Sequence, residues 1–362
     1  MSVWKNLFAT RWGIIGVGLV IGVLAALLQK WGNPGNMGIC VACFERDIAG
    51  GLGLHRAAVV QYVRPEIIGF VLGAFLSAYL FKEFRPRAGS APIVRFVLGA
   101  IAMIGALVFL GCPWRALLRL AGGDGNALFG LLGLVTGVWI GTLFFKQGYN
   151  LGRTQVTYSS VGWILPLLMV GLLLLRLIFP PLPELAQNSI LFYSLKGPGA
   201  MYAPVMVSLA VGLLIGLICQ RSRFCTMGAF RDLILFGQAH LFSGVLALLA
   251  AAWVTNLIVG QFHPGFANQP VAHTMEIWNF GGMVVAGLAF ALAGGCPGRQ
   301  LFLAGEGDGD AAVFVLGMIV GAGVAHNSKL ASSPQGIGQY GIIAVILGLL
   351  ACLAIGYTMR IK

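Results

Sequence analysis

The chain has 362 residues, of which 58% are hydrophobic and only 9% are charged. A soluble core does not need this much apolar sequence, so the composition excludes a soluble globular protein and indicates a multi-pass membrane protein. A formal net charge of +12 would suggest a nucleic-acid partner in a soluble protein. Here the Lys and Arg residues lie mostly between apolar runs, which membrane topology explains, so no nucleic acid is expected.

Ten apolar runs are long enough to be interpreted as membrane spans, and they form two sets of five. The runs lie at about 12–29, 66–81, 93–111, 127–145 and 161–179, and then at about 203–220, 239–260, 279–295, 311–327 and 341–358. The first run follows Lys5 and Arg11 but lacks a small-x-small cleavage site, so we expect a retained span and not a signal peptide. A polar, proline-rich stretch separates the two sets. The predicted organisation is a first repeat over 1–180, a connector over 181–200 and a second repeat over 201–362.

The later part of each set carries the same motif. When Cys112 is aligned with Cys296, the segments 112–137 and 296–321 are identical at 11 of 26 positions without a gap. The shared positions include a Cys-Pro-x-Arg start, a Gly-Asp-Gly turn and a GxxxG pair. A second pattern, C-x5-R-D, begins at Cys40 in one set and at Cys225 in the other. Both patterns indicate a duplicated structural unit, and the GxxxG pairs are most simply sites of helix packing.

A repeat of five spans enters the membrane from the opposite side in its second copy, because five is an odd number. Inverted repeats of this kind are typical of transporters, with the substrate site near the midplane where the repeats meet. The Lys and Arg residues between spans place both termini in the cytoplasm. The expected fold is therefore an all-α polytopic membrane protein with two inverted-topology repeats of five spans each.

Proline directly after cysteine, bracketed by glycine, suits the first turn of a new helix better than the interior of an old one. We therefore expect the chain to break at Cys112 and at Cys296 and to restart as short re-entrant half-helices. Non-helical backbone at membrane depth is tolerated only where protein buries it or where it lines a cavity. Each break is thus a candidate element of a central constriction.

The residues at these breaks suit a soft anion. Helix N-termini present unpaired N–H groups, and Arg115 and Arg299 add permanent cations. Thiols offer polarizable sulfur and a weak S–H donor, so a constriction lined by cysteines suits a sulfur- or selenium-containing anion better than a hard oxyanion. The predicted substrate-binding residues are Cys40, Cys112, Cys225, Cys296, Arg115 and Arg299. The thiols either stay protonated or react and carry sulfur covalently, and both alternatives stay open.

Several features of the motifs also have structural interpretations. Cys219 and Cys352 lie inside spans without a motif and are expected to be buried apolar residues. Arg46-Asp47 and Arg231-Asp232 are either ion pairs at helix ends or site residues. Asp124 and Asp308 are expected to cap helices or to pair with Arg115 and Arg299 rather than to relay protons.

Metal and cofactor sites are not expected. Cys40 and Cys43 form a CxxC pair that would serve as a redox pair or as half of a zinc site, but no second CxxC or suitably spaced His pair accompanies it. No metal and no cofactor are therefore predicted.

These motifs resemble those of the YeeE/YedE family of bacterial inner-membrane proteins, which are transporters of sulfur compounds such as thiosulfate. The resemblance covers nearly the whole chain, and it implies that Cys40, Cys112 and Cys296 line the path of the anion. Cys225 and the ten predicted spans look more like the YedE branch, which is associated with selenium metabolism. The resemblance also implies a small sulfur-carrier protein of the TusA type as a cytoplasmic partner, beside the membrane lipid.

The leading hypothesis is a transporter, not an enzyme, that passes a small sulfur or selenium anion inward. One alternative is a membrane thiol oxidoreductase or sulfurtransferase that uses Cys40 and Cys43 or a persulfide on Cys296. A second is a channel or structural subunit for an unrelated solute. Arginine at membrane depth in both copies argues against the second alternative, because packing alone does not require it.

Overall fold

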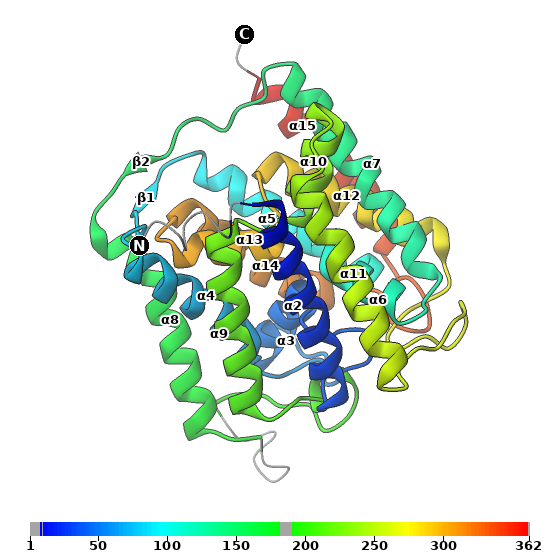
Figure 1. The fold of residues 1–362 in the computed structure, drawn as a ribbon. Coiled ribbons are helices and arrows are strands. Elements are labelled where there is room, and N and C mark those ends of the chain that lie inside the picture. Colours follow the sequence, from blue (N-terminus) through cyan, green and yellow to red (C-terminus); the bar gives the residue numbers. More distant parts are fainter. Residues whose placement is uncertain (1–7, 9, 182–189, 361–362) are drawn as a thin grey trace.

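The computed structural model describes residue 8, residues 10–181 and residues 190–360. Most of these residues are helical, and Figure 1 shows long helices surrounding shorter ones. The first half contains α2 (Arg11–Lys30), α3 (Val41–Gly51), α4 (Pro65–Leu80), β1 (Arg87–Ala88), α5 (Pro92–Phe109), α6 (Pro113–Ala121), α7 (Asn126–Lys146), β2 (Gln155–Val156) and α8 (Ser159–Ile178). The second contains η2 (Pro198–Ala200), α9 (Val205–Ser222), α10 (Thr226–Phe236), α11 (His240–Ile258), α12 (Glu276–Ala293), α13 (Pro297–Gly305), α14 (Gly309–Asn327) and α15 (Gly341–Thr358).

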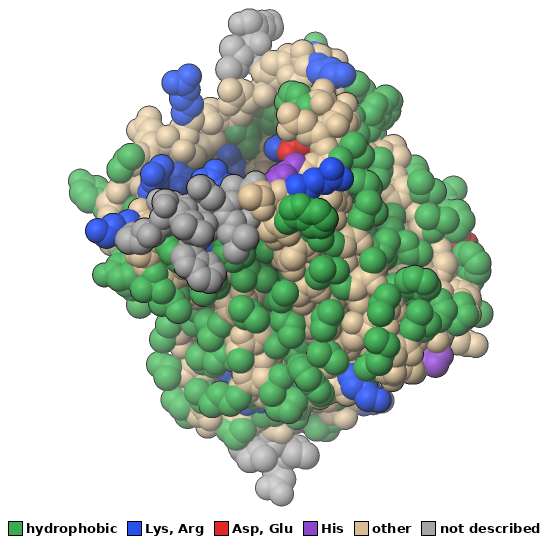
Figure 2. All heavy atoms as spheres, viewed as in Figure 1, with side chains coloured by type: hydrophobic (Ala, Val, Ile, Leu, Met, Phe, Trp, Pro, Cys, Tyr) green, Lys and Arg blue, Asp and Glu red, His purple; other side chains and the backbone are tan. Residues whose placement is uncertain are grey.

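The expectation of an all-α polytopic membrane protein is confirmed. Within the described residues, nine helical stretches are long and apolar enough to cross a membrane. The predicted run at 66–81 is not among them, because it forms the 16-residue helix α4, which is shorter than a typical span. Figure 2 shows a broad band of hydrophobic side chains around the middle of the molecule, with many Lys and Arg side chains toward its upper end. This distribution is what a lipid-embedded surface requires.

The two halves contain matching helices that pack on one another. The most extensive helix contacts pair α2 with α11, α4 with α9, α5 with α14 and α7 with α12. If α2–α8 are matched in order with α9–α15, exchanging the halves converts the α2–α11 contact into the α9–α4 contact. It likewise converts the α5–α14 contact into the α12–α7 contact. Such reciprocal contacts are expected of two units related by a two-fold axis, while the inverted topology stays a prediction.

The GxxxG pairs mark places where helix backbones meet, as the sequence predicts. A Cβ atom added at Gly137 of α7 would lie 2.2 Å from the carbonyl oxygen of Val284 in α12. A Cβ atom added at Gly317 of α14 would lie 2.2 Å from the carbonyl oxygen of Phe96 in α5. Only glycine permits this approach, so the repeated glycines fix how closely the two halves pack.

Candidate functional site

The predicted breaks before the short helices are confirmed. Helix α5 is followed by Leu110, which adopts a left-handed conformation, and α6 begins with Pro113 in its first turn. Helix α12 is followed by Gly294, which is also left-handed, and α13 begins with Pro297. Proline fits the first turn because its missing N–H would have no partner there. Cys112 and Cys296 are therefore the N-cap residues of two short helices inside the protein.

Cys40 and Cys225 occupy the same position on the other two short helices. The sulfur of Cys40 accepts a hydrogen bond from the backbone N–H of Cys43 at 3.3 Å, at the start of α3. The sulfur of Cys225 accepts one from the N–H of Gly228 at 3.2 Å, at the start of α10. All four motif cysteines thus lie where a helix presents unpaired N–H groups, and all four are buried.

The four motif cysteines are arranged as two thiol pairs, one made by each half. The Cys40 and Cys112 sulfurs lie 3.8 Å apart, and those of Cys225 and Cys296 lie 3.7 Å apart. All seven cysteines are free, and in the described part of the chain no cluster of His, Cys, Asp and Glu is suited to hold a metal ion. We call these the first and the second thiol pair. Cys219 and Cys352 are fully buried inside α9 and α15.

An aromatic cluster connects the surroundings of the two thiol pairs. Trp114, two residues after Cys112, lies 6.3 Å from the ring of Phe224, which directly precedes Cys225. The same indole lies 5.9 Å from the ring of Phe70 and 6.1 Å from that of Phe302. Its Nε1 is buried and has no hydrogen-bond partner among the described residues. Trp114 therefore occupies the region between the pairs and holds an unused donor there.

The two motif arginines have different environments. Arg115 is fully buried, and its guanidinium donates to the carbonyl oxygens of Leu110, Asn36, Pro270 and Val271 and to the sulfur of Cys43. Arg299 is partly exposed and pairs with Glu306 at 3.2 Å. It lines a hollow of about 260 Å³ whose other lining residues are Glu83, Arg85, Arg87, Gln220, Arg223 and Glu306. Of these two arginines, Arg299 is therefore the one that borders a hollow.

Of the two roles expected for the turn aspartates, helix capping is confirmed for Asp308, whereas the ion-pair partners predicted for both residues are wrong. Asp124 pairs with Arg119 at 2.6 Å and not with Arg115. Asp308 caps α14 by accepting a hydrogen bond from the N–H of Ala311. Its ion pair is formed with Arg87 at 2.8 Å and not with Arg299. In both cases an arginine from outside the Cys-Pro-x-Arg motif lies nearer to the carboxylate.

The arginine–aspartate pairs of the C-x5-R-D motifs do form ion pairs, but in the middle of α3 and α10 and not at helix ends. Arg46 and Asp47 are 2.6 Å apart, and Asp47 also pairs with Arg64 at 2.7 Å. Arg231 and Asp232 are 2.8 Å apart and remain partly exposed. The first pair is thus part of a buried network, whereas the second lies near the surface.

Sequence reasoning missed two polar groups at this site. Glu45 is fully buried on α3, and neither carboxyl oxygen has a hydrogen-bond partner in the described part of the chain. Trp114 occupies the variable position of the Cys-Pro-x-Arg motif, where Gly298 stands in the second copy. The available signal for Glu45 was an ionisable residue at membrane depth, which is functional by default.

Comparison with known proteins gives a family and three relatives. The Sulphur transport family matches residues 1–113 and 221–359. The thiosulfate transporter TsuA of Spirochaeta thermophila is 33% identical over 103 residues, which cover 28% of this chain and 31% of that protein. TsuA of Escherichia coli is 28% identical over 107 residues, or 30% of each chain. The probable transporter YedE of Salmonella typhimurium is 25% identical over 258 residues, or 67% of this chain and 59% of that protein.

The matches to the two TsuA proteins thus span about a third of those proteins, whereas the family match covers both halves of this chain and includes all four motif cysteines. The broken short helices and the buried thiol pairs occur in both halves, and the family match likewise covers both halves. The chain belongs to the Sulphur transport family.

Proposed function

We propose that this protein carries a small sulfur-containing anion across the membrane past its two thiol pairs. The observation that carries the proposal is the placement of four buried thiols at four helix starts, in two pairs with sulfurs 3.8 and 3.7 Å apart. Helix starts favour negative charge, and sulfur makes soft, polarizable contacts with a sulfur-containing anion. Two of the relatives are thiosulfate transporters, which supports thiosulfate as the first substrate to test.

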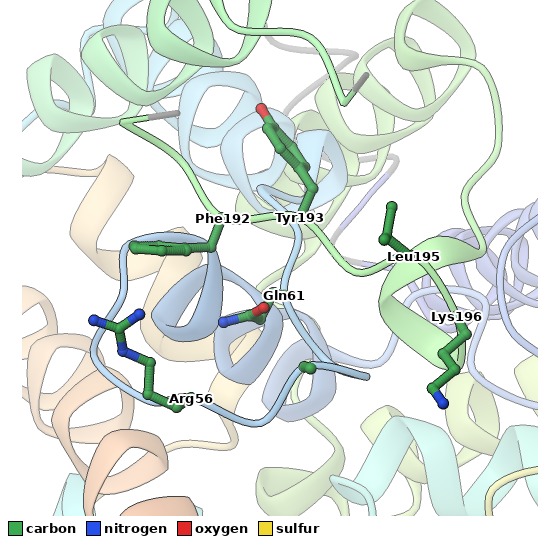
Figure 3. A pocket seen from close by; sticks show the side chains of 7 residues that line it. Arg56, Gln61, Phe192, Tyr193, Leu195 and Lys196 are labelled. Carbon is green, nitrogen blue, oxygen red and sulfur yellow. The ribbon is translucent and has the colours of Figure 1, made fainter. Parts of the chain in front are cut away.

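Basic hollows at opposite ends of α4 support an entrance and an exit for the anion. One hollow of about 580 Å³ is lined by Arg56, Gln61 and Lys196 together with Phe192 and Tyr193, and it lies just before α4 begins (Figure 3). The Arg299 hollow includes Glu83, just after α4 ends. A helix of 16 residues is about 24 Å long. Positive charge at both ends would concentrate an anion at each mouth.

We further propose that residues 1–180 and 201–362 are inverted repeats in a bacterial inner membrane. The connector 181–200 would then be periplasmic and both termini cytoplasmic. Residues 182–189 of this connector lie outside the described residues. In Figure 1, α2 begins and α15 ends toward the upper end, whereas α8 ends and α9 begins at the lower end. This arrangement supports termini and connector on opposite sides.

The topology is tested by labelling introduced cysteines with a membrane-impermeant thiol reagent. The native cysteines are buried, which limits background labelling. We expect Lys196→Cys to be labelled from the periplasm and Arg360→Cys only after the membrane is opened. Labelling of both sites from the same side would exclude the inverted arrangement.

The function is tested with labelled thiosulfate, selenite and sulfate in proteoliposomes that contain only this protein. We expect thiosulfate to enter faster than sulfate, and selenite uptake decides whether a selenium anion is also accepted. If the proteoliposomes take up none of these anions, the proposal is wrong. A substrate-derived sulfur on Cys296 in mass spectrometry, without uptake, would instead favour a sulfurtransferase.

A soluble partner on the cytoplasmic side is the remaining part of the proposal. The arginines of the Arg299 hollow would hold the anion where a sulfur-carrier protein of the TusA type can collect it. We expect addition of such a carrier inside the proteoliposomes to increase net uptake. Uptake that is unchanged at saturating carrier would remove this partner from the proposal.

A further inference from the structure

Glu45 differs from the other acidic residues buried around the first thiol pair, because its carboxyl group has neither an ion-pair nor a hydrogen-bond partner among the described residues. Asp47 pairs with Arg46 and Arg64, and Asp124 pairs with Arg119. One oxygen of Glu66 accepts hydrogen bonds from Asn33 and Ser208. Both oxygens of Glu45, in contrast, are buried without a hydrogen-bond partner among the described residues. An ionised carboxylate in this position would cost several kcal/mol, so the neutral acid is the stable form.

The carboxyl group lies beside the first thiol pair. Glu45 follows Cys40 by five residues on α3, and it is close enough to Cys112 to interact with it electrostatically. Helix α3 packs against α4, α5, α13 and α14. The titratable and charged groups on and around these elements are Arg46, Asp47, Arg64, Glu66, Arg95, Arg115, Arg119, Asp124, Arg299, Glu306, Asp308, Asp310, His55 and His326, together with the cysteines.

The second half shows that packing does not require a carboxyl group here. In the duplicated C-x5-R-D motif, Phe230 stands five residues after Cys225, at the position that corresponds to Glu45. A buried acid retained in one copy and replaced by an apolar ring in the other therefore needs a chemical reason. A group that gains and loses a proton next to the thiols is such a reason.

We propose that Glu45 is a proton-binding site that couples the movement of a proton to the passage of the anion past the first thiol pair. This inference rests on the proposed transport function. The ionised carboxylate repels an anion, whereas the acid donates its O–H to it, so the anion occupies the first thiol pair only when Glu45 holds a proton. The proton enters with the anion from one side and leaves Glu45 on the other, which makes the protein a symporter of protons and anions.

The first test compares the infrared spectra of the purified wild-type protein and Glu45→Gln. Gln keeps the size and the donor of the neutral acid, so the fold is expected to be retained. We expect a carbonyl band of a protonated carboxylic acid near neutral pH that loses one component in Glu45→Gln, and a shift of that component when thiosulfate is added. Glu276→Gln, at the start of α12, is the matched control and should leave the band unchanged. Identical spectra of the wild type and Glu45→Gln would overturn the proposal.

The second test measures thiosulfate uptake into proteoliposomes with and without an inward proton gradient. For one proton per anion, a gradient of one pH unit should raise accumulation in the wild type by up to about tenfold. Glu45→Gln should still equilibrate thiosulfate but should not respond to the gradient. An equal response of both proteins would overturn the coupling. If the wild type takes up no anion at all, the transport function fails, and the infrared comparison still decides whether Glu45 holds a proton.

Discussion

The two copies of the Cys-Pro-x-Arg motif have the same backbone but different surroundings. In the first half, Arg115 is buried and bonded to four backbone carbonyls, and Trp114 fills the variable position. In the second half, Arg299 lines a hollow beside Glu306, and Gly298 fills the variable position. The two halves therefore share the broken helix and the thiol but differ at the arginine, so we expect a structural role for Arg115 and a role toward the anion for Arg299.

Replacing the two arginines should separate these roles, with the largest effect on Arg115. Arg115→Gln leaves several buried carbonyl oxygens without donors, and each unsatisfied group costs about 1–3 kcal/mol. We expect loss of folded protein in detergent, measured as a lower thermal unfolding midpoint and poor recovery in size-exclusion chromatography.

Arg299→Gln is the matched variant in the other half. It should fold normally and reduce anion uptake, more than Lys329→Gln in the turn after α14 does. A stable Arg115→Gln protein, or an Arg299→Gln protein with normal uptake, would contradict the division between the halves.

The two halves also differ at the variable position of the motif, where Trp114 of the first half contacts Gly298 of the second. Substitutions at these two residues test this contact. A Cβ atom added at Gly298 would lie 3.2 Å from Cζ2 of Trp114. Gly298→Leu should therefore overpack the region between the thiol pairs, at a cost of about 1–3 kcal/mol, and should slow uptake.

Gly171→Leu on α8 is the control, because no atom lies within 4 Å of its added Cβ. The exchanged double variant, Trp114→Gly with Gly298→Trp, should recover part of the stability, because the two sites are coupled. Additive losses in the double variant would show that the two positions do not share one space.

Much of this arrangement follows from the sequence, because its signals are local. Glycine and proline around Cys112 and Cys296 predict the broken helices, and the GxxxG pairs predict close packing. The ion-pair partners were wrong because they depend on which face of a short helix each arginine occupies. Arg119 lies one turn after Arg115 and nearer to Asp124, while Arg115 reaches Pro270 and Val271 in the other half.

The complementary fit of Trp114 and Gly298 and the isolation of Glu45 are tertiary properties. Each half, read alone, shows only a variable position and an acidic residue inside a motif. Neither property can be inferred until the two halves are placed against each other.

Substitution of the thiols tests whether the two pairs contribute alike. If a thiol only offers a weak hydrogen bond and soft contact, each is worth about 1 kcal/mol. Ser at Cys40, Cys112, Cys225 or Cys296 should then lower uptake about tenfold or less per site. Cys219→Ser and Cys352→Ser, in spans without a motif, should be silent. Complete loss at one site, with a substrate-derived adduct trapped there, would show covalent sulfur transfer instead of binding.

The smallest expected effect concerns His55, which is buried just after α3. Its Nε2 lies 3.0 Å from the carbonyl oxygen of Arg46, and its ring centroid lies 4.5 Å from that of His326. Burial lowers the pKa of His55 below its usual value, so protonation favours the unfolded chain. The stabilisation is therefore complete above the unfolded pKa of about 6.5 and is lost as the pH falls below it.

Thermal unfolding midpoints at about pH 8 and about pH 5, on either side of that pKa, measure this effect. The wild type should lose more stability between the two values than His55→Gln, which cannot take up the proton. His240→Gln is the matched control and should behave like the wild type, because His240 is the corresponding residue of the second half, where it is partly exposed as the first residue of α11. If the wild type and His55→Gln lose the same stability between the two pH values, other groups cause the acid sensitivity, and His326 is the nearest of them.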